Sequence, residues 1–93
     1  MQVKFSRSAV KFLKKLDDTR QERIRAKIAL LRTSLEEQEA LPADELDLKK
    51  LKGDWKSYFR IRVGQIRIIF KIKPEADEIL IYSIDFRGSA YDS

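Results

Sequence analysis

The most regular pattern of apolar and polar positions in the chain occupies residues 58–72. Two runs of alternating residues are joined there by Gly64-Gln65, and a two-residue loop containing glycine between such runs is typical of a β-hairpin. With this loop, Arg62 lies directly opposite Arg67. One face of the hairpin is apolar and carries Phe59, Ile61, Val63, Ile66, Ile68, Phe70 and Ile72. The other face is polar and carries Tyr58, Arg60, Arg62, Arg67 and Lys71.

Apolar residues at helical spacing precede the hairpin in two stretches. The alternating residues 2–5 predict a short strand, and Ser6 or Ser8 can cap a first helix that ends at Asp17-Asp18. Its apolar positions are Ala9, Phe12, Leu13 and Leu16. Residues 19–22 form a capping-box pattern for a second helix. The apolar stripe of that helix consists of Ile24, Ile28, Leu31 and Leu35. Because few residues separate the two helices, they are expected to form an αα-hairpin.

An acidic segment that contains Pro42 breaks the helical pattern over residues 36–47. The leucines expected to attach this region to the core are Leu46, Leu48 and Leu51. After the hairpin, a loop at residues 73–78 precedes a last strand at residues 79–85. That strand is apolar on both faces, which favours a central position in the sheet.

The order of these elements predicts an α+β fold formed by a single domain, residues 1–93. An N-terminal strand and an αα-hairpin are followed by a three-stranded antiparallel meander. The helices need an apolar sheet surface and the hairpin supplies one, so both helices are expected on that face. The basic, concave face of the sheet is then expected to be open.

The composition excludes several kinds of chemistry. The chain has no cysteine and no histidine, which excludes disulfides, thiolate metal sites, the usual zinc ligand and the usual general base. No apolar run approaches the ~20 residues that a membrane-spanning helix needs. No secretory signal is apparent, so the cytoplasm is the expected location.

Positive charge is concentrated at the hairpin. The chain carries +5 overall, but residues 49–73 hold nine Lys or Arg and one Asp, a net charge of +8. Like charges directly opposite each other in a sheet, as with Arg62 and Arg67, are destabilising by up to about 1 kcal/mol. This pairing predicts a bound polyanion, and arginine with nearby aromatic rings suits RNA. A solvated basic face, paired with acids from residues 36–48, is the alternative.

Four motifs of the chain resemble the RelE/ParE toxin superfamily. They are residues 51–53, 58–64 and 66–70, and residues 84–87 followed by Tyr91. The resemblance implies a toxin of a type II toxin–antitoxin system that acts as a ribosome-dependent mRNA endoribonuclease, or mRNA interferase. Cleavage would proceed by attack of the RNA 2′-hydroxyl and would inhibit translation. The expected partners are a cognate antitoxin, the ribosome and mRNA, and no cofactor is expected.

The resemblance also suggests roles for individual residues. The candidate catalytic residues, by position, are Arg60, Arg62, Arg67, Arg87 and Tyr91. Tyr91 would stack on a base or assist proton transfer, although a C-terminal anchoring role is the alternative. The residues expected to hold flanking RNA are Lys50, Lys52, Tyr58 and Lys71.

The sequence departs from the family pattern at the groups that move protons. Arg60 and Arg62 stand where the best-known branch has lysines, and arginine stays protonated, so it cannot act as a base. Phe86 stands where many relatives have histidine, and Asp85 stands where the best-known branch has arginine; Asp85 is a weaker candidate for the base. A ParE-like toxin that binds DNA gyrase, or a catalytically degenerate binding module, therefore stays open as an alternative.

An antitoxin of this superfamily is expected to cover an apolar groove beside the helices. The candidate lining residues of that groove are Leu13, Leu16 and Leu35. Trp55 is expected to pack against neighbouring side chains rather than to stack on a base. Gly53 and Gly64 are expected to be turn residues.

Overall fold

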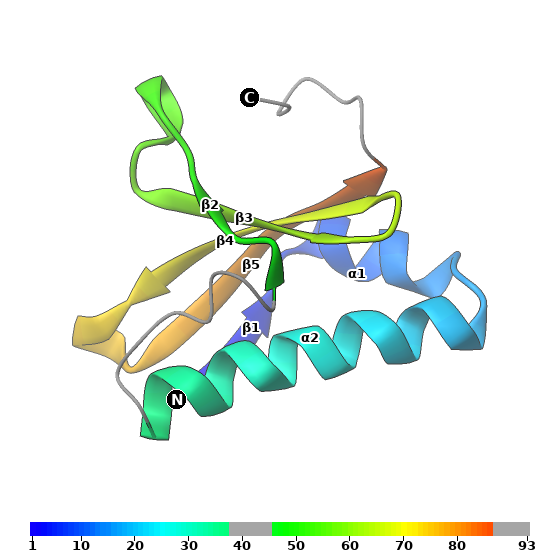
Figure 1. The fold of residues 1–93 in the computed structure, drawn as a ribbon, viewed down its shortest axis with the longest axis horizontal. Helices are drawn as coiled ribbons and strands as arrows, with labels where there is room; N and C mark the ends of the chain where they lie inside the picture. The colour runs from blue at the N-terminus through cyan, green and yellow to red at the C-terminus, as the bar shows by residue number, and fades with distance from the viewer. Residues whose placement is uncertain (38–45, 87–93) are drawn as a thin grey trace.

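A computed structural model describes residues 1–37 and 46–86 of the chain (Figure 1). Its helices and strands are β1 (Gln2–Phe5), α1 (Arg7–Lys14), α2 (Asp18–Glu37), β2 (Lys49–Lys50), β3 (Tyr58–Val63), β4 (Ile66–Lys73) and β5 (Glu78–Phe86). Two short 3₁₀ helices, η1 (Gly53–Trp55) and η2 (Pro74–Ala76), lie between strands. The sheet has the order β1-β5-β4-β3-β2, with β1 parallel to β5 and the other neighbours antiparallel. The predicted α+β fold is confirmed, and β5 lies inside the sheet as expected.

The core forms between the helices and one face of the sheet. Ile24, Ile28 and Leu31 of α2 are buried together with Ile61 of β3 and Ile68 of β4. The α1 helix packs on β5, and α2 packs on β3 (Figure 1). This arrangement confirms the predicted apolar stripe of α2 and the predicted apolar face of the hairpin. No helix in the described part of the chain is long and apolar enough to cross a membrane.

The connection between the helices differs in one detail from the sequence-based prediction. Ser6 caps α1 as expected, since its hydroxyl accepts a hydrogen bond from the Ala9 amide at 3.1 Å. The second helix, however, begins at Asp18, and the Asp17 carboxylate accepts a hydrogen bond from the Arg20 amide at 3.4 Å. The capping box expected at Thr19 was therefore placed two residues late. Aspartate and threonine both cap well, so the sequence offered two competing starts.

The β3–β4 hairpin has the register that the sequence predicts. Val63 pairs with Ile66, and Arg62 pairs with Arg67. Gly64 has a φ of 61°, a left-handed conformation that glycine adopts without the steric cost of a Cβ atom. The sequence thus sets the hairpin register through the residues of its turn.

A β-bulge in the β4–β5 pair changes which side chains of β5 face the core. Ile69 pairs with Ser83 and the next residue, Phe70, pairs with Ile81, so Tyr82 is the extra residue. Side chains of a regular strand alternate, so residues three apart would face opposite sides. Because of the bulge, Ile81 and Ile84 are both buried in the core, while Tyr82 stays 36% exposed.

The basic face of the sheet is only partly open, which corrects the expectation of an open face. Arg60 is 3% exposed and Arg67 is 1% exposed, whereas the side chain of Arg62 is 28% exposed. Arg60 lies beneath the chain at Asp47, whose backbone oxygen accepts a hydrogen bond from it at 3.5 Å. Arg67 belongs to β4, which has strand neighbours on both sides. Only Arg62 of these three arginines presents a substantial part of its side chain to solvent.

The N-terminus is fixed to the far end of α2. The Met1 amino group donates a hydrogen bond to the Glu36 carboxylate, and this bond raises the pKa of the amino group and lowers the pKa of Glu36. Asp77, at the turn before β5, lies 3.7 Å from the same amino group. These contacts hold the start of β1 beside α2 and β5.

Candidate functional site

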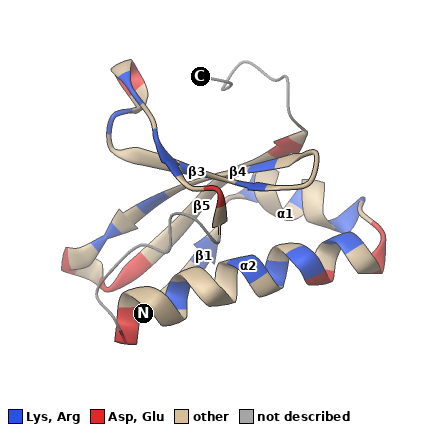
Figure 2. Cartoon of the chain, viewed as in Figure 1, with Lys and Arg blue, Asp and Glu red and all other residues tan. Residues whose placement is uncertain are grey.

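Three arginines lie on one face of the sheet, opposite the helices. Arg60 and Arg62 are two residues apart in β3, so their side chains share a face. Arg62 lies opposite Arg67 of β4, and Arg67 in turn lies opposite Asp85 of β5. Directly opposed residues have Cβ atoms about 4.5–5.5 Å apart, so the sheet holds these charges close together. Figure 2 shows the concentration of Lys and Arg on the hairpin and along α2.

Asp47 connects two of these arginines. One carboxylate oxygen lies 3.8 Å from Arg60 Nη2, and the other lies 3.8 Å from Arg62 Nη1. Asp47 has a φ of 49° and a side chain that is 61% exposed. A single carboxylate thus spans two guanidinium groups, as two oxygens of a phosphate can. The contacts are long, and the Asp47 carboxylate is exposed although Arg60 is buried, so a phosphate that approaches from solvent can compete with this carboxylate.

An aromatic cluster borders the arginines, formed by Trp55 of η1, Tyr58 of β3 and Tyr82 of β5. The ring centroids are 5.1 Å apart for Trp55 and Tyr58, and 5.3 Å apart for each of the other two pairs, all in edge-to-face geometry. The Lys71 ammonium lies 5.6 Å from the centre of the Tyr58 ring, within cation–π range. The prediction that Trp55 packs against its neighbours is confirmed.

The comparison with known proteins assigns the chain to a family. The family model described as "ParE toxin of type II toxin-antitoxin system, parDE" matches residues 3–91. The chain belongs to this toxin family. It is 36% identical over 92 residues to Toxin RelE3 of Methanocaldococcus jannaschii, a match that covers 99% of this chain and 97% of that protein.

Solved structures of similar proteins agree with this assignment. The RelB–RelE antitoxin–toxin complex of M. jannaschii contains a chain that is 32% identical to the toxin, with a TM-score of 0.65 and coverage of 96% and 95% of the two chains. The archaeal RelE–RelB complex of Pyrococcus horikoshii OT3 gives 26% identity, a TM-score of 0.69 and coverage of 96% and 97%. The resemblance inferred from the sequence motifs is therefore confirmed, and the protein is a toxin of a type II toxin–antitoxin system.

The structure brings only some of the predicted site residues of the toxin together. Arg60, Arg62 and Arg67 are adjacent, and Tyr58 and Lys71 form a cross-strand pair beside them. Arg87 and Tyr91 lie outside the described residues.

The register of β2 divides its two lysines between the faces of the sheet. Lys50 pairs with Phe59 and so belongs to the apolar side of β3, whereas Lys49 pairs with Arg60 on the arginine side. Lys52 is exposed just before η1. The register therefore places Lys49, rather than Lys50, on the face that carries the arginines.

Two residues at the site of the toxin were not singled out from the sequence. Asp47 belongs to the acidic segment 36–48, whose pairing with the basic face was the alternative expectation, and its contacts with Arg60 and Arg62 bear out that alternative in part. Tyr82 is the single aromatic side chain in the apolar part of the last strand, but only the bulge turns it toward Trp55 and Tyr58. No group of three His, Cys, Asp or Glu side chains suited to a metal occurs within residues 1–37 and 46–86.

Proposed function

We propose that this toxin is a ribosome-dependent mRNA endoribonuclease of the RelE type. The observation that carries the proposal is the group formed by Arg60, Arg62 and Arg67, with the carboxylate of Asp47 spanning two of them. Such a cluster suits the phosphate of an RNA backbone. The similarity to the protein named Toxin RelE3 gives independent support.

The chemistry requires no external nucleophile. The 2′-hydroxyl oxygen of the RNA bonds to the adjacent phosphorus, and the bond from phosphorus to the 5′-oxygen breaks. One proton leaves the 2′-hydroxyl and one proton reaches the departing 5′-oxygen. Arg62 donates hydrogen bonds to the non-bridging oxygens, where each such donor contributes roughly 2.7–4 kcal/mol to barrier lowering.

The arginines differ in access, and their proposed roles differ accordingly. Arg62 contacts the phosphate directly because its side chain is the most exposed of the three. Arg67 lies directly opposite Arg62 in β4 and adds positive charge to the same site. Arg60 steadies a flanking phosphate together with Lys71 and Tyr58. By position in the family, Arg87 adds a further cation, and Tyr91 is the candidate for base stacking or proton transfer.

The proposed protein partner is a cognate antitoxin. The two solved structures described above are complexes of RelE with RelB, which supports this partner. The structure describes an apolar groove of about 170 Å³ between β1 and α2, lined by Val3, Phe5, Ile28 and Ala29 with Arg25 and Arg32. The leucines expected to line the antitoxin groove, Leu13, Leu16 and Leu35, are instead half-buried against the core. The groove between β1 and α2 is therefore the better candidate for the surface that the antitoxin covers.

The test of the nuclease function uses a translating extract and mapping of mRNA 5′ ends. Wild-type toxin should produce cuts in phase with codons. Arg62→Gln should slow cleavage by about 10²- to 10³-fold, the cost of removing one transition-state donor. Arg7→Gln, which removes one exposed charge from α1, is the matched control and should cleave like wild type. Intact mRNA together with inhibition of DNA gyrase would refute the nuclease function and favour the ParE-like alternative.

A further inference from the structure

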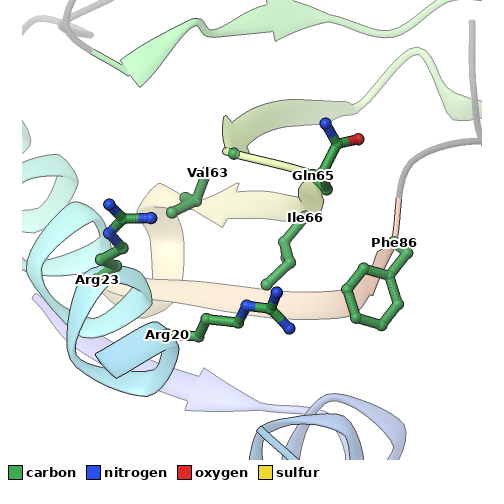
Figure 3. A pocket seen from close by; sticks show the side chains of 7 residues that line it. Arg20, Arg23, Val63, Gln65, Ile66 and Phe86 are labelled. Atoms are coloured by element: carbon green, nitrogen blue, oxygen red, sulfur yellow. The ribbon is translucent and has the colours of Figure 1, made fainter. Parts of the chain in front are cut away.

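A pocket lies between the first turns of α2 and the β3–β4 turn. It has a volume of about 180 Å³ and is lined by Arg20, Arg23, Val63, Gly64, Gln65, Ile66 and Phe86. Figure 3 shows Arg20 and Arg23 extending from α2 toward Val63, Ile66 and Phe86. Val63 and Ile66 are buried, so they form an apolar floor, whereas Phe86 is 43% exposed. The Phe12 ring packs against the Phe86 ring at a centroid distance of 5.2 Å and holds it in place.

A second hollow continues from this pocket to Arg62. It is lined by Arg23, Ala26, Lys27, Arg62, Val63 and Gly64, three of which also line the first pocket. In the described part of the chain, β2 pairs with β3 only at Phe59 and Arg60, so Arg62 lies beyond the β2–β3 ladder, with the Asp47 carboxylate 3.8 Å away. The two hollows together, termed the turn groove, therefore connect α2 with the arginine site.

The turn groove is strongly basic. Its lining includes Arg20, Arg23, Lys27 and Arg62 and contains no acid. Arg20 has a neighbouring carboxylate, Asp17, at 3.7 Å, but both side chains are more than half exposed. No described acid lies within ion-pair distance of Arg23. An apolar floor with a rim of guanidinium and ammonium groups suits a chain that has both flat rings and negative charge.

We infer that the turn groove binds single-stranded RNA that continues from the phosphate held at Arg62, an inference that rests on the proposed nuclease function. One base packs against Val63, Ile66 and Phe86, and the backbone phosphates lie at Arg23 and Lys27. Packing of a base on an aromatic ring strengthens binding of any sequence, and phosphate contacts add an attraction that weakens with salt. The groove thus extends the RNA contact beyond the scissile phosphate toward α2.

The test measures binding of 2′-O-methyl RNA, which has no free 2′-hydroxyl and cannot be cleaved. Fluorescence anisotropy compares oligonucleotides of about four and about ten nucleotides, lengths that bracket short and extended single-strand sites. The double variant Arg23→Gln/Lys27→Gln should weaken binding of the longer RNA about tenfold and leave binding of the shorter RNA within about twofold. For this variant, the slope of log Kd against log salt concentration should become shallower by about 0.7 for each phosphate that it no longer neutralises.

A charge-matched control separates this effect from general electrostatics. Arg7→Gln/Lys14→Gln removes two exposed charges from α1, outside the turn groove, and should change both affinities by less than about twofold. Phe86→Leu should weaken binding of the longer RNA without altering the salt dependence, because it removes a ring and no charge.

Three results would overturn the inference. The first is an equal loss of affinity in the two charge-matched double variants. The second is the absence of binding between wild-type toxin and the longer RNA. The third is that Arg23→Gln/Lys27→Gln binds the longer RNA like wild type but no longer binds an acidic antitoxin peptide, which would assign the groove to a protein partner. Cleavage in the translating extract tests the nuclease function separately. A toxin that cleaves mRNA but shows one of these three results would therefore refute the turn-groove inference alone.

Discussion

Replacing Asp47 by asparagine should increase the affinity of the toxin for RNA. The carboxylate of Asp47 lies 3.8 Å from both Arg60 and Arg62, and an incoming phosphate must compete with it. Asparagine keeps the shape of the side chain, and it tolerates the positive φ of 49° that this position requires. The substitution therefore removes a charge and introduces little backbone strain.

The expected magnitude follows from the geometry. Two unit charges at this separation interact by about 1 kcal/mol in water. The side chain of Asp47 is 61% exposed, so each of its two pairs contributes less than that ideal value. The two pairs together contribute about 1 kcal/mol, which a phosphate no longer has to overcome when Asp47 is replaced by asparagine. This difference in binding free energy corresponds to an affinity gain of about fivefold. The free energy of unfolding should fall by less than about 1 kcal/mol.

The assay is binding of the uncleavable 2′-O-methyl RNA at several salt concentrations, with urea unfolding in parallel. Asp77→Asn is the matched control because Asp77 also has a positive φ, 51°, and lies in the turn before β5. The control should leave RNA affinity within about twofold of wild type. Unchanged or weaker RNA binding by Asp47→Asn, with the fold intact, would refute the competition between carboxylate and phosphate.

Three further predictions concern the structure around the site. Tyr82→Ala should remove two edge-to-face ring pairs, lower stability by about 1–3 kcal/mol and reduce the Tm measured by circular dichroism, whereas Tyr82→Phe should retain the Tm. The hydrogen bond between the Met1 amino group and Glu36 raises the pKa of the amino group from 8.0 and lowers the pKa of Glu36 from 4.5. The stability that this hydrogen bond contributes should thus be lost as the pH rises through the raised pKa of the amino group, and also as the pH falls through the lowered pKa of Glu36. Urea unfolding measured across pH should show that the alkaline loss of stability disappears after N-terminal acetylation. Gly64→Val should be less stable than wild type by about 1–2 kcal/mol, and Gly64→Asn should lose less, because the left-handed φ of 61° disfavours a branched side chain. No atom lies within 4 Å of an added Cβ, so the cost comes from the backbone conformation. Equal urea midpoints for the two variants would contradict this prediction.

The positions of the helices were predictable because the signals are local. The spacing of Ile24, Ile28 and Leu31 fixes the buried face of α2, and their burial agrees with it. The start of α2 was less certain, since Asp17 and Thr19 both suit a helix cap and only one of them is used. Competition between two suitable caps so close together is decided by how α1 and α2 meet.

The sequence by itself determined the hairpin and its opposed arginines. Alternation with a period of two and a two-residue turn at Gly64 set Arg62 against Arg67, because each residue of a strand fixes the orientation of the next. This pairing is local and needs no other part of the chain.

Only the tertiary structure decided which of these charges meets solvent and what surrounds them. Arg62 is partly exposed and Arg67 is buried, a difference that depends on neighbouring strands rather than on the hairpin pattern. Asp47 reaches Arg60 from 13 positions earlier in the chain, and a bulge in β5 turns Tyr82 toward the aromatic cluster. Burial and ion pairing depend on contacts between residues far apart in the chain, and periodicity along one strand carries no information about them.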